Sequence, residues 1–359
     1  MAFTICTWLC ADAPGEESIY KQMRGKSSAQ TFQAVYWRNI YLFYLSSRKV
    51  NHTAAHILFT NSLPPVVDGF DMQRALEALE VQVVQVPFDY KTPTGYYEAW
   101  RNQFYEFSIL DHIARHYPLS DQWLLLDSDC VFTRSVENLP AIAERHNGIL
   151  TYTLVEPPGT SIHGLTQPQM QTLYAELLQK PVPTLPTYHA GEFYFSDGNW
   201  AKRFSDDFAL LWPILLERHA QNKSRLTEEA HVLSYLYYKY GVSDVGTANP
   251  VIKRLWTQPF IFRNVEPADT DYAIWHLPHE KRYGLKTIFG KVIKRPLTYW
   301  LQLPDAAFMN MLKYHLTVPT ISPFIYATRL LPIQAARVVY YGLQSALQTV
   351  RGSLKLAGN

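Results

Sequence analysis

Short runs of apolar residues along this chain alternate with longer segments that carry one apolar face. The short runs span residues 3–9, 54–60, 81–86 and 148–155. Between the first two lies a segment, about residues 29–46, whose apolar residues recur at spacings of four, four and three, which is typical of a helix packed on one side. Strands and helices that alternate at this spacing predict βαβ units. We therefore expect an α/β fold with a mostly parallel central sheet flanked by helices.

One further apolar run ends in two carboxylates. Trp123-Leu124-Leu125-Leu126 reads as a strand buried on both faces, and Asp127-Ser128-Asp129 follows it directly. Ligand sites of open α/β sheets lie beyond the carboxyl ends of the strands. Two carboxylates at i and i+2 in that place can bind one Mn²⁺ or Mg²⁺ ion and leave its other positions to phosphate oxygens. The alternative is a polar turn in which Asp127 or Asp129 caps the next segment.

The later part of the chain supplies other candidate residues. A helix is expected over about residues 96–117, with Arg101 on its first turns. A strand over 188–198 is entered through Gly191, which indicates either a close approach to a ligand or a bulge. Thr227 is expected to cap a helix that begins with Glu228 and Glu229. His276 follows an apolar stretch and precedes a turn, as a ligand at a strand end would.

Composition and charge limit the class of protein. The chain has 359 residues, 47% hydrophobic and 18% charged, which describes a globular protein with a sizeable core. Its three cysteines lack metal spacing, which favours a reducing compartment, and the amino-terminal sequence predicts a cytoplasmic protein without a signal peptide. No apolar run is long enough to span a bilayer as a helix. Nothing in the sequence indicates a nucleic-acid partner.

These features together resemble nucleotide-sugar-dependent glycosyltransferases of the GT-A fold. The resemblance rests on the amino-terminal βαβ units, the Asp127-Ser128-Asp129 motif, the Ala190-Gly191-Glu192 strand, the two glutamates at 228 and 229, and Trp275-His276-Leu277-Pro278. It implies a Rossmann-like GT-A catalytic domain over residues 1–280, with a nucleotide-binding half (1–155) and an acceptor half (156–280). Residues 281–359 then form a basic, mainly helical extension.

The resemblance also implies roles for individual residues. Asp129 would bind the metal ion, Asp127 the metal ion or the ribose, and His276 would be the third protein ligand. The positions expected to contact the nucleotide are Thr7, Trp8, Thr60, Asn61, Arg101, Asp127 and Lys281. An inverting enzyme also needs a carboxylate base for the acceptor hydroxyl, and the candidates are Glu192, Asp197, Glu228 and Glu229. The expected reaction is metal-dependent transfer of a hexosyl group from a nucleotide sugar, with a UDP-sugar as the preferred donor, to a glycan, lipid-linked or protein acceptor.

Two other functions fit part of the sequence. Asp127-Ser128-Asp129-Cys130-Val131 also matches the first motif of haloacid-dehalogenase-like phosphatases, in which the first Asp is the nucleophile. That motif normally opens its domain, whereas several βα units precede it here. The second alternative is a non-catalytic protein of the same fold that binds carbohydrate or a membrane.

The carboxyl-terminal extension is strongly basic. From Lys281 onward, eleven Lys and Arg residues and one acidic residue give a net charge of +10, which leaves −8 for residues 1–280. Apolar residues at spacings of three and four form one stripe, made of Ile333, Ala336, Tyr340, Leu343, Leu347 and Val350. This stripe predicts either a packed terminal helix or a peripheral contact with the anionic inner face of a membrane.

Overall fold

The computed structural model describes residues 2–20, 23, 25–97, 99–242 and 246–341. The strands are β1 (Phe3–Leu9), β2 (Ala55–Thr60), β3 (Val66–Val67), β4 (Phe70–Asp71), β5 (Val81–Gln85), β6 (Gln122–Leu126), β7 (Cys130–Phe132), β8 (Ile149–Leu150), β9 (Phe193–Asp197), β10 (Ile252–Arg254), β11 (Thr257–Gln258), β12 (Phe262–Arg263) and β13 (Ile274–His276). The α-helices are α1 (Gln30–Val50), α2 (Met72–Ala78), α3 (Tyr105–His116), α4 (Leu139–Glu144), α5 (Gln167–Leu178), α6 (Gly198–Ala220), α7 (Glu229–Lys239), α8 (Gly284–Val292), α9 (Leu297–Gln302), α10 (Asp305–Leu316) and α11 (Pro323–Ile325). A 3₁₀ helix, η1 (Pro267–Asp271), and a π-helix, η2 (Tyr326–Leu330), complete the elements.

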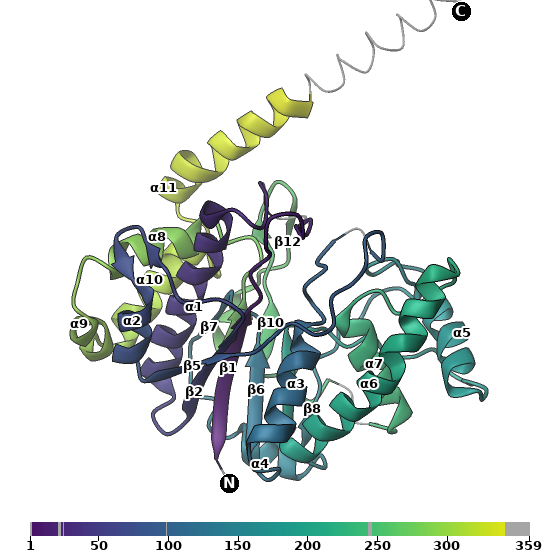
Figure 1. The fold of residues 1–359 in the computed structure, drawn as a ribbon. Coiled ribbons are helices and arrows are strands. Elements are labelled where there is room, and N and C mark those ends of the chain that lie inside the picture. The colour runs from purple at the N-terminus through teal and green to yellow at the C-terminus, as the bar shows by residue number, and fades with distance from the viewer. Residues whose placement is uncertain (1, 21–22, 24, 98, 243–245, 342–359) are drawn as a thin grey trace, which may run out of the picture.

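A six-stranded sheet forms the centre of the molecule (Figure 1), in the order β5-β2-β1-β6-β9-β8. The strands β5, β2, β1 and β6 are parallel, and β9 runs antiparallel to both β6 and β8. Every residue of β6 is buried, because helices cover both faces of the sheet. The expected α/β fold with a mostly parallel central sheet is confirmed.

Two hydrophobic cores lie on the two faces of this sheet. On one face α1 packs against α8, and the rings of Tyr41 and Phe289 meet edge to face with their centroids 6.0 Å apart. On the other face α3 packs against α6, and Phe107 stacks on Phe208 at 3.8 Å. Figure 1 shows these two layers on opposite sides of the strands. Buried aromatic pairs of this kind fix the helices and, with them, the loops at the carboxyl ends of the strands.

A second, three-stranded sheet continues from the end of β6. Its order is β10-β13-β7, with β13 antiparallel to β7 and parallel to β10. Because β7 begins only a few residues after β6, the turn between them is held between the two sheets. This turn carries Asp127 and Asp129.

Two expected helix starts differ from the structure. The helix expected from about residue 96 begins at Tyr105, because Gly95 and Trp100 adopt positive φ angles of 77° and 50°, which a right-handed helix does not allow. Thr227 does not cap α7: the cap position belongs to Glu228. The Thr227 hydroxyl instead donates to the carbonyl of His163 at 2.7 Å.

The chain beyond residue 280 first packs on the body of the molecule and then leaves it. Residues of α8 and α10, such as Ile288 and Leu312, belong to the same buried core as β1. From Leu331 to Tyr341 a helix continues η2 and projects away from the body (Figure 1). None of the helices in the described ranges is both long and apolar enough to cross a membrane. Of the predicted stripe, Leu343, Leu347 and Val350 lie outside the described residues.

Candidate active site

The backbone pairing of three strands brings the two aspartates and the histidine together. Antiparallel pairing places His276 opposite Cys130, and the amide of Leu277 donates to the carbonyl of Asp129 at 3.1 Å. His276 therefore lies beside Asp129, although 147 positions separate the two in the chain. On the other side of β6, Leu126 pairs with Phe193, so that Glu192 lies beside Asp127.

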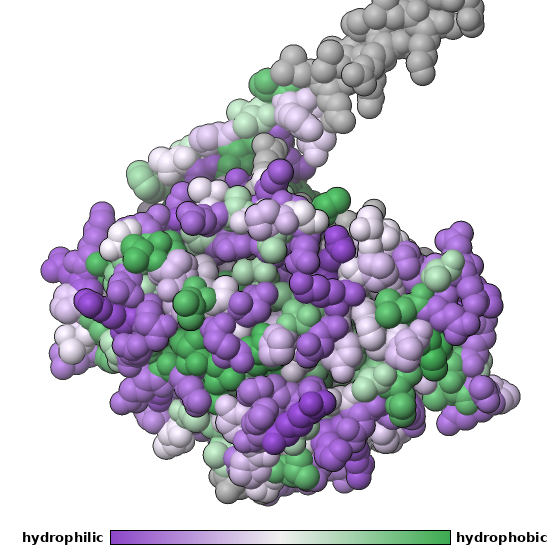
Figure 2. All heavy atoms as spheres, viewed as in Figure 1, coloured by the Kyte–Doolittle hydropathy of each residue, from purple (hydrophilic) through white to green (hydrophobic). Residues whose placement is uncertain are grey.

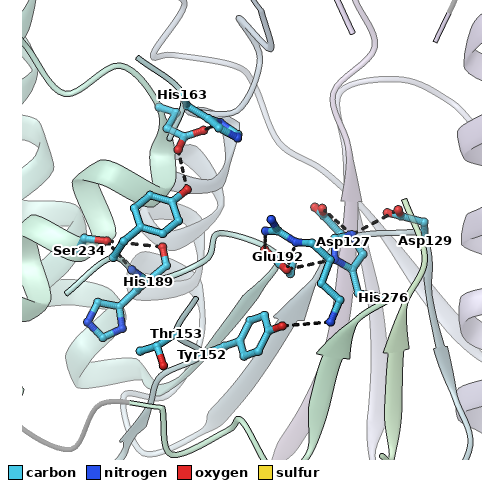
Figure 3. Close-up of polar contacts among 12 residues, drawn as sticks. Asp127, Asp129, Tyr152, Thr153, His163, His189, Glu192, Ser234 and His276 are labelled. Carbon is cyan, nitrogen blue, oxygen red and sulfur yellow. Dashed lines mark hydrogen bonds and ion pairs between the residues drawn. The ribbon is translucent and has the colours of Figure 1, made fainter. Parts of the chain in front are cut away.

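Asp127, Asp129 and His276 form a cluster whose ligand atoms all lie within 4.8 Å of one another. His276 Nε2 is 3.5 Å from Oδ2 of Asp127 and 3.3 Å from Oδ2 of Asp129. Figure 3 shows the three side chains turned toward one another at the end of the sheet. Two carboxylates and one imidazole nitrogen form a ligand set that suits a divalent cation such as Mn²⁺.

The polar atoms of this cluster have unfilled hydrogen-bonding capacity. Oδ1 of Asp129 is buried without a partner, whereas Oδ2 of Asp129 and Nε2 of His276 make ion-pair contacts but no well-formed hydrogen bond. Buried polar atoms without partners are rare and call for an explanation, such as an ion. The residues present therefore fit a bound divalent cation.

His276 is oriented by a buried ion pair behind it. Its Nδ1 lies 3.1 Å from Oε1 of Glu192. Arg254 donates hydrogen bonds to both oxygens of that carboxylate, with its Nε 2.6 Å from Oε1. An imidazole held through one nitrogen presents the other to a metal in a fixed direction. Glu192, expected as a candidate base, is thus engaged in positioning His276.

Charge in the cluster is balanced by Lys281, whose Nζ lies 3.2 Å from Oδ2 of Asp129. Burial alone would raise the pKa of Asp129, but Lys281 and His276 hold it below its ordinary value. Burial would lower the pKa of His276, yet Asp129 and Glu192 raise it well above the usual value. These carboxylates therefore favour the protonated form of the imidazole.

A cleft opens over the cluster and encloses about 840 Å³ of open space, including the solvent at its mouth. Its lining includes Asp127, Glu229, Trp256 and the strand neighbours Arg254 and His276. A second hollow of about 470 Å³ adjoins it along the end of β1 and is lined by residues that include Trp8, Tyr36, Asn102, Asp129 and Lys281.

Glu229 lines the cleft with a perturbed carboxyl group. Burial, followed by repulsion from Glu228 and Glu106, raises the pKa of Glu229 well above its ordinary value. Its Oε2 is buried without a hydrogen-bond partner. A Cβ at Gly191 would lie 2.3 Å from its Oε1, so only glycine leaves room for this carboxylate in its present position.

Glu228 has a different environment from its neighbour. It accepts a hydrogen bond from the Tyr188 hydroxyl at 2.7 Å and pairs with the ring of His163. Burial raises its pKa, but His163 and His231 outweigh that effect and lower it. Figure 3 shows His163 in this second group of contacts, apart from the cluster around His276. Glu228 and Glu229 both line the cleft, but the Glu228 carboxylate is engaged by Tyr188 and His163, whereas Oε2 of Glu229 has no hydrogen-bond partner.

Several other residues expected at the site do not line the cleft, although Asn61 and Arg101 line a further hollow beside the end of β1. Thr7 is fully buried and donates to the carbonyl of Leu126 at 2.8 Å, and Thr60 is also fully buried. Asn61 bridges to the backbone of Ala11, and Arg101 donates to the carbonyl of Thr92. Asp197 lies at the far end of β9, opposite Gln122, where it caps α6 through the amide of Trp200. Of the expected nucleotide contacts, Trp8, Asp127 and Lys281 line the cleft.

Two residues of the site were missed by the sequence analysis. Glu106 lies on α3, buried, and accepts a hydrogen bond from Trp8 Nε1 at 3.1 Å. Arg254, on β10, holds Glu192 as described. Neither has a local motif, and the only sequence signal is a charged residue within an otherwise apolar or strand-like stretch.

The chain was compared with known families, curated proteins and solved structures. No family model and no curated protein sequence matches it. Among solved structures it is similar to mouse xyloside xylosyltransferase 1 in its apo form, with 11% identity, coverage of 77% of this chain and 97% of the mouse chain, and a TM-score of 0.43. It is also similar to apo WbbM, a bifunctional glycosyltransferase, with 10% identity, coverage of 77% of this chain and 45% of that chain, and a TM-score of 0.47.

These comparisons concern the arrangement of the backbone. The chain spans less than half of the length of WbbM. Both of these structures are of glycosyltransferases, and the resemblance to the GT-A fold stays a prediction from the sequence. The feature of this chain that bears on its chemistry is the cluster of Asp127, Asp129 and His276.

Proposed function

We propose that this protein is a metal-dependent glycosyltransferase that transfers a hexosyl group from a nucleoside diphosphate sugar, with UDP-sugars as the preferred donors. The observation that carries the proposal is the convergence of Asp127, Asp129 and His276 beside a cleft at the carboxyl end of parallel strands, with Oδ1 of Asp129 buried and without a hydrogen-bond partner. A divalent cation bound there supplies neutralisation of the negative charge that develops on the leaving diphosphate.

In this proposal the hollow along β1 binds the donor nucleotide, and the cleft binds the transferred sugar and the acceptor. Lys281 lines both hollows, and its ammonium group can contact the donor phosphates as well as Asp129. Trp8 and Asn102 offer an aromatic face and an amide to the nucleoside along the end of β1. The cleft beside Glu229 and Arg254 then receives the transferred sugar and the acceptor.

Glu229 is the carboxylate that we assign as the general base. It faces the cleft without a partner for Oε2, and its raised pKa makes its ionised form a stronger base than an exposed glutamate. Asp127 is one of the groups that raise this pKa, so a cation bound at Asp127 favours the ionised form of Glu229. A base that activates the acceptor hydroxyl implies direct displacement with inversion at the anomeric carbon.

A phosphatase reaction has less support from the same geometry. In that reaction Asp127 would be the nucleophile. Here Asp127 lies in a cluster with His276, and Glu192 holds Nδ1 of that histidine in the way that carboxylates orient metal-binding histidines.

The test is hydrolysis and transfer with a panel of UDP-sugars in the presence of Mn²⁺. We expect UDP release that EDTA abolishes and Mn²⁺ restores, and a sugar product whose anomeric configuration, read by NMR at early times, is opposite to that of the donor. Phosphate release from p-nitrophenyl phosphate without UDP release would instead favour the phosphatase. A product with retained configuration would remove Glu229 from the role of base while leaving the transferase standing.

A further inference from the structure

The projecting helix, residues 331–341, leaves a large groove between itself and the body of the molecule. The groove has a volume of about 1930 Å³. Its helix side is formed by Ile333, Ala336, Arg337 and Tyr341. The opposite side is formed by Ile261 and Phe262, at the tip of the β11–β12 hairpin, together with His279 and Arg282.

Large apolar side chains are exposed on the hairpin and on the projecting helix. Ile261 and Phe262, which line the groove, are 54% and 55% exposed, and Tyr340 and Tyr341, which line its helix side, are 53% and 56% exposed. Val338 and Val339 lie on the same helix outside the groove lining and are 62% and 61% exposed. Figure 2 shows apolar residues among more polar ones along the projecting helix. Single exposed apolar residues are ordinary, but a cluster on two neighbouring elements marks an interaction surface.

Basic residues accompany these apolar side chains. Arg282 and Arg337 line the groove, and the chain from Lys281 onward carries a net charge of +10 against −8 for the rest. An apolar surface rimmed by cations is complementary to an anionic lipid bilayer, where each basic residue near the surface contributes about 1 kcal/mol. Within the described ranges no helix meets the requirements for a membrane span, so the contact is peripheral.

The groove also adjoins the candidate active site. Trp256, Pro278 and Lys281 line both the groove and the cleft over Asp127. If the protein binds another surface through the groove, the cleft therefore lies next to that surface.

We propose that the projecting helix and the β11–β12 hairpin together dock the protein on an anionic bilayer, so that the cleft receives an acceptor embedded in that same membrane. The assignment of the acceptor as a membrane lipid rests on the proposed glycosyltransferase function. The docking itself does not.

The test is flotation of the full chain with phosphatidylcholine vesicles containing 30% phosphatidylglycerol, compared with vesicles of phosphatidylcholine alone. At low salt we expect the wild-type protein to float with the anionic vesicles and to be released at high salt. The double variant Ile261→Asp with Phe262→Asp and the double variant Val338→Asp with Val339→Asp should each bind at least tenfold more weakly. The variant Arg282→Glu with Arg337→Glu, which changes charge without touching an apolar residue, should lose the preference for anionic vesicles.

The matched control is Leu210→Asp with Ile214→Asp, which replaces two apolar residues of α6 that are 72% and 46% exposed, away from the projecting helix (Figure 1). It should bind the vesicles as the wild type does. Wild-type protein that stays in solution with anionic vesicles at low salt, or a control that weakens binding as much as the docking variants, would overturn the proposal. Mn²⁺-dependent UDP binding should be unchanged in the docking variants. If the wild type shows no Mn²⁺-dependent UDP binding, the proposed glycosyltransferase function fails, but the membrane-docking proposal does not.

Discussion

His276 joins the metal cluster to the buried charges behind it. Its Nε2 faces both aspartates, and its Nδ1 faces Glu192, which Arg254 holds in turn. In the metal-free protein these carboxylates raise the pKa of His276 well above its ordinary value. A metal ion can bind only to the neutral imidazole, so it must displace this proton.

Metal affinity should accordingly depend on pH. Below the raised pKa of His276, each unit of increase in pH should strengthen Mn²⁺ binding by up to about tenfold, because one proton is released on binding. Calorimetric titration of the wild-type protein at several pH values between 6 and 8 measures this slope. His276→Asn should bind Mn²⁺ more weakly and with a flatter dependence on pH. Identical slopes in the two proteins would show that His276 does not bind the metal.

Glu229 should carry the chemical step rather than donor binding. Glu229→Gln keeps the size of the side chain but cannot accept a proton, so kcat should fall by about 10²- to 10⁴-fold while the Kd for UDP changes little. The rise of kcat/KM with pH that the wild type owes to ionisation of Glu229 should disappear. Glu77→Gln, an exposed glutamate of α2, is the control and should behave as the wild type. Unchanged turnover in Glu229→Gln would contradict its assignment as the base.

At the residue scale, the sequence predicted the groups that follow buried strands. Asp127, Asp129 and His276 each lie at a strand end whose apolar run is visible in the chain. Glu106 and Arg254 were not predicted. Their partners, Trp8 and Glu192, are 98 and 62 positions away in the chain, and no local sequence pattern indicates these contacts. The choice between Glu228 and Glu229 also depended on tertiary contacts, since the two are adjacent in sequence and differ only in what surrounds them.

Among the elements, the start of α6 is fixed by a close approach of two backbones. A Cβ on Gly198 would lie 2.7 Å from the Cα of Leu119, and the Gly198 amide donates to the carbonyl of Asp121 at 2.9 Å. Backbone atoms cannot move aside as the end of a side chain can. Glycine is therefore needed where β9 turns into α6 behind the sheet.

Gly198→Ala should destabilise the protein by about 1–3 kcal/mol, as overpacking of a core does. Gly290→Ala is the matched control: this glycine lies within α8, and a Cβ there would meet nothing within 4 Å. It should stabilise the protein by about 0.5–1 kcal/mol, because alanine favours a helix. Urea denaturation of both variants gives the two free energies of unfolding. A neutral Gly198→Ala would mean that the loop at Leu119 adapts freely.

The strands were predicted where a short apolar run is bounded by turn residues. The runs that became β1, β2 and β6 are almost wholly buried, and β5 is partly exposed, but the type and position of all four followed from the sequence. The start of α3 did not, because the positive φ of Trp100 comes from the loop that packs over the cleft and not from its own propensity. The short strands β7 and β10 to β13 exist through pairing with one another, which no local pattern shows.

At the scale of the whole molecule, the candidate site joins distant parts of the chain. The turn after β6 supplies two of the three clustered side chains, β13 supplies the third, and Lys281 lies just beyond it. The core that supports this arrangement extends from β1 to α10, so residues after 280 help to hold the site in place. In the function that we propose, metal, donor and acceptor would occupy the adjoining hollows beside this cluster.

The central claim is that Asp127, Asp129 and His276 bind a divalent cation that in turn binds a nucleoside diphosphate. Isothermal titration of UDP into the protein, with and without Mn²⁺, tests it most directly, with Asp129→Asn as the variant and Asp271→Asn, an exposed aspartate outside the cleft, as the control. We predict that UDP binds the wild type and the control at least tenfold more tightly with Mn²⁺ than without it, and that Asp129→Asn loses this gain while keeping its fold by circular dichroism. UDP binding that is insensitive to Mn²⁺, or that gains equally from Mn²⁺ in Asp129→Asn, would contradict the account.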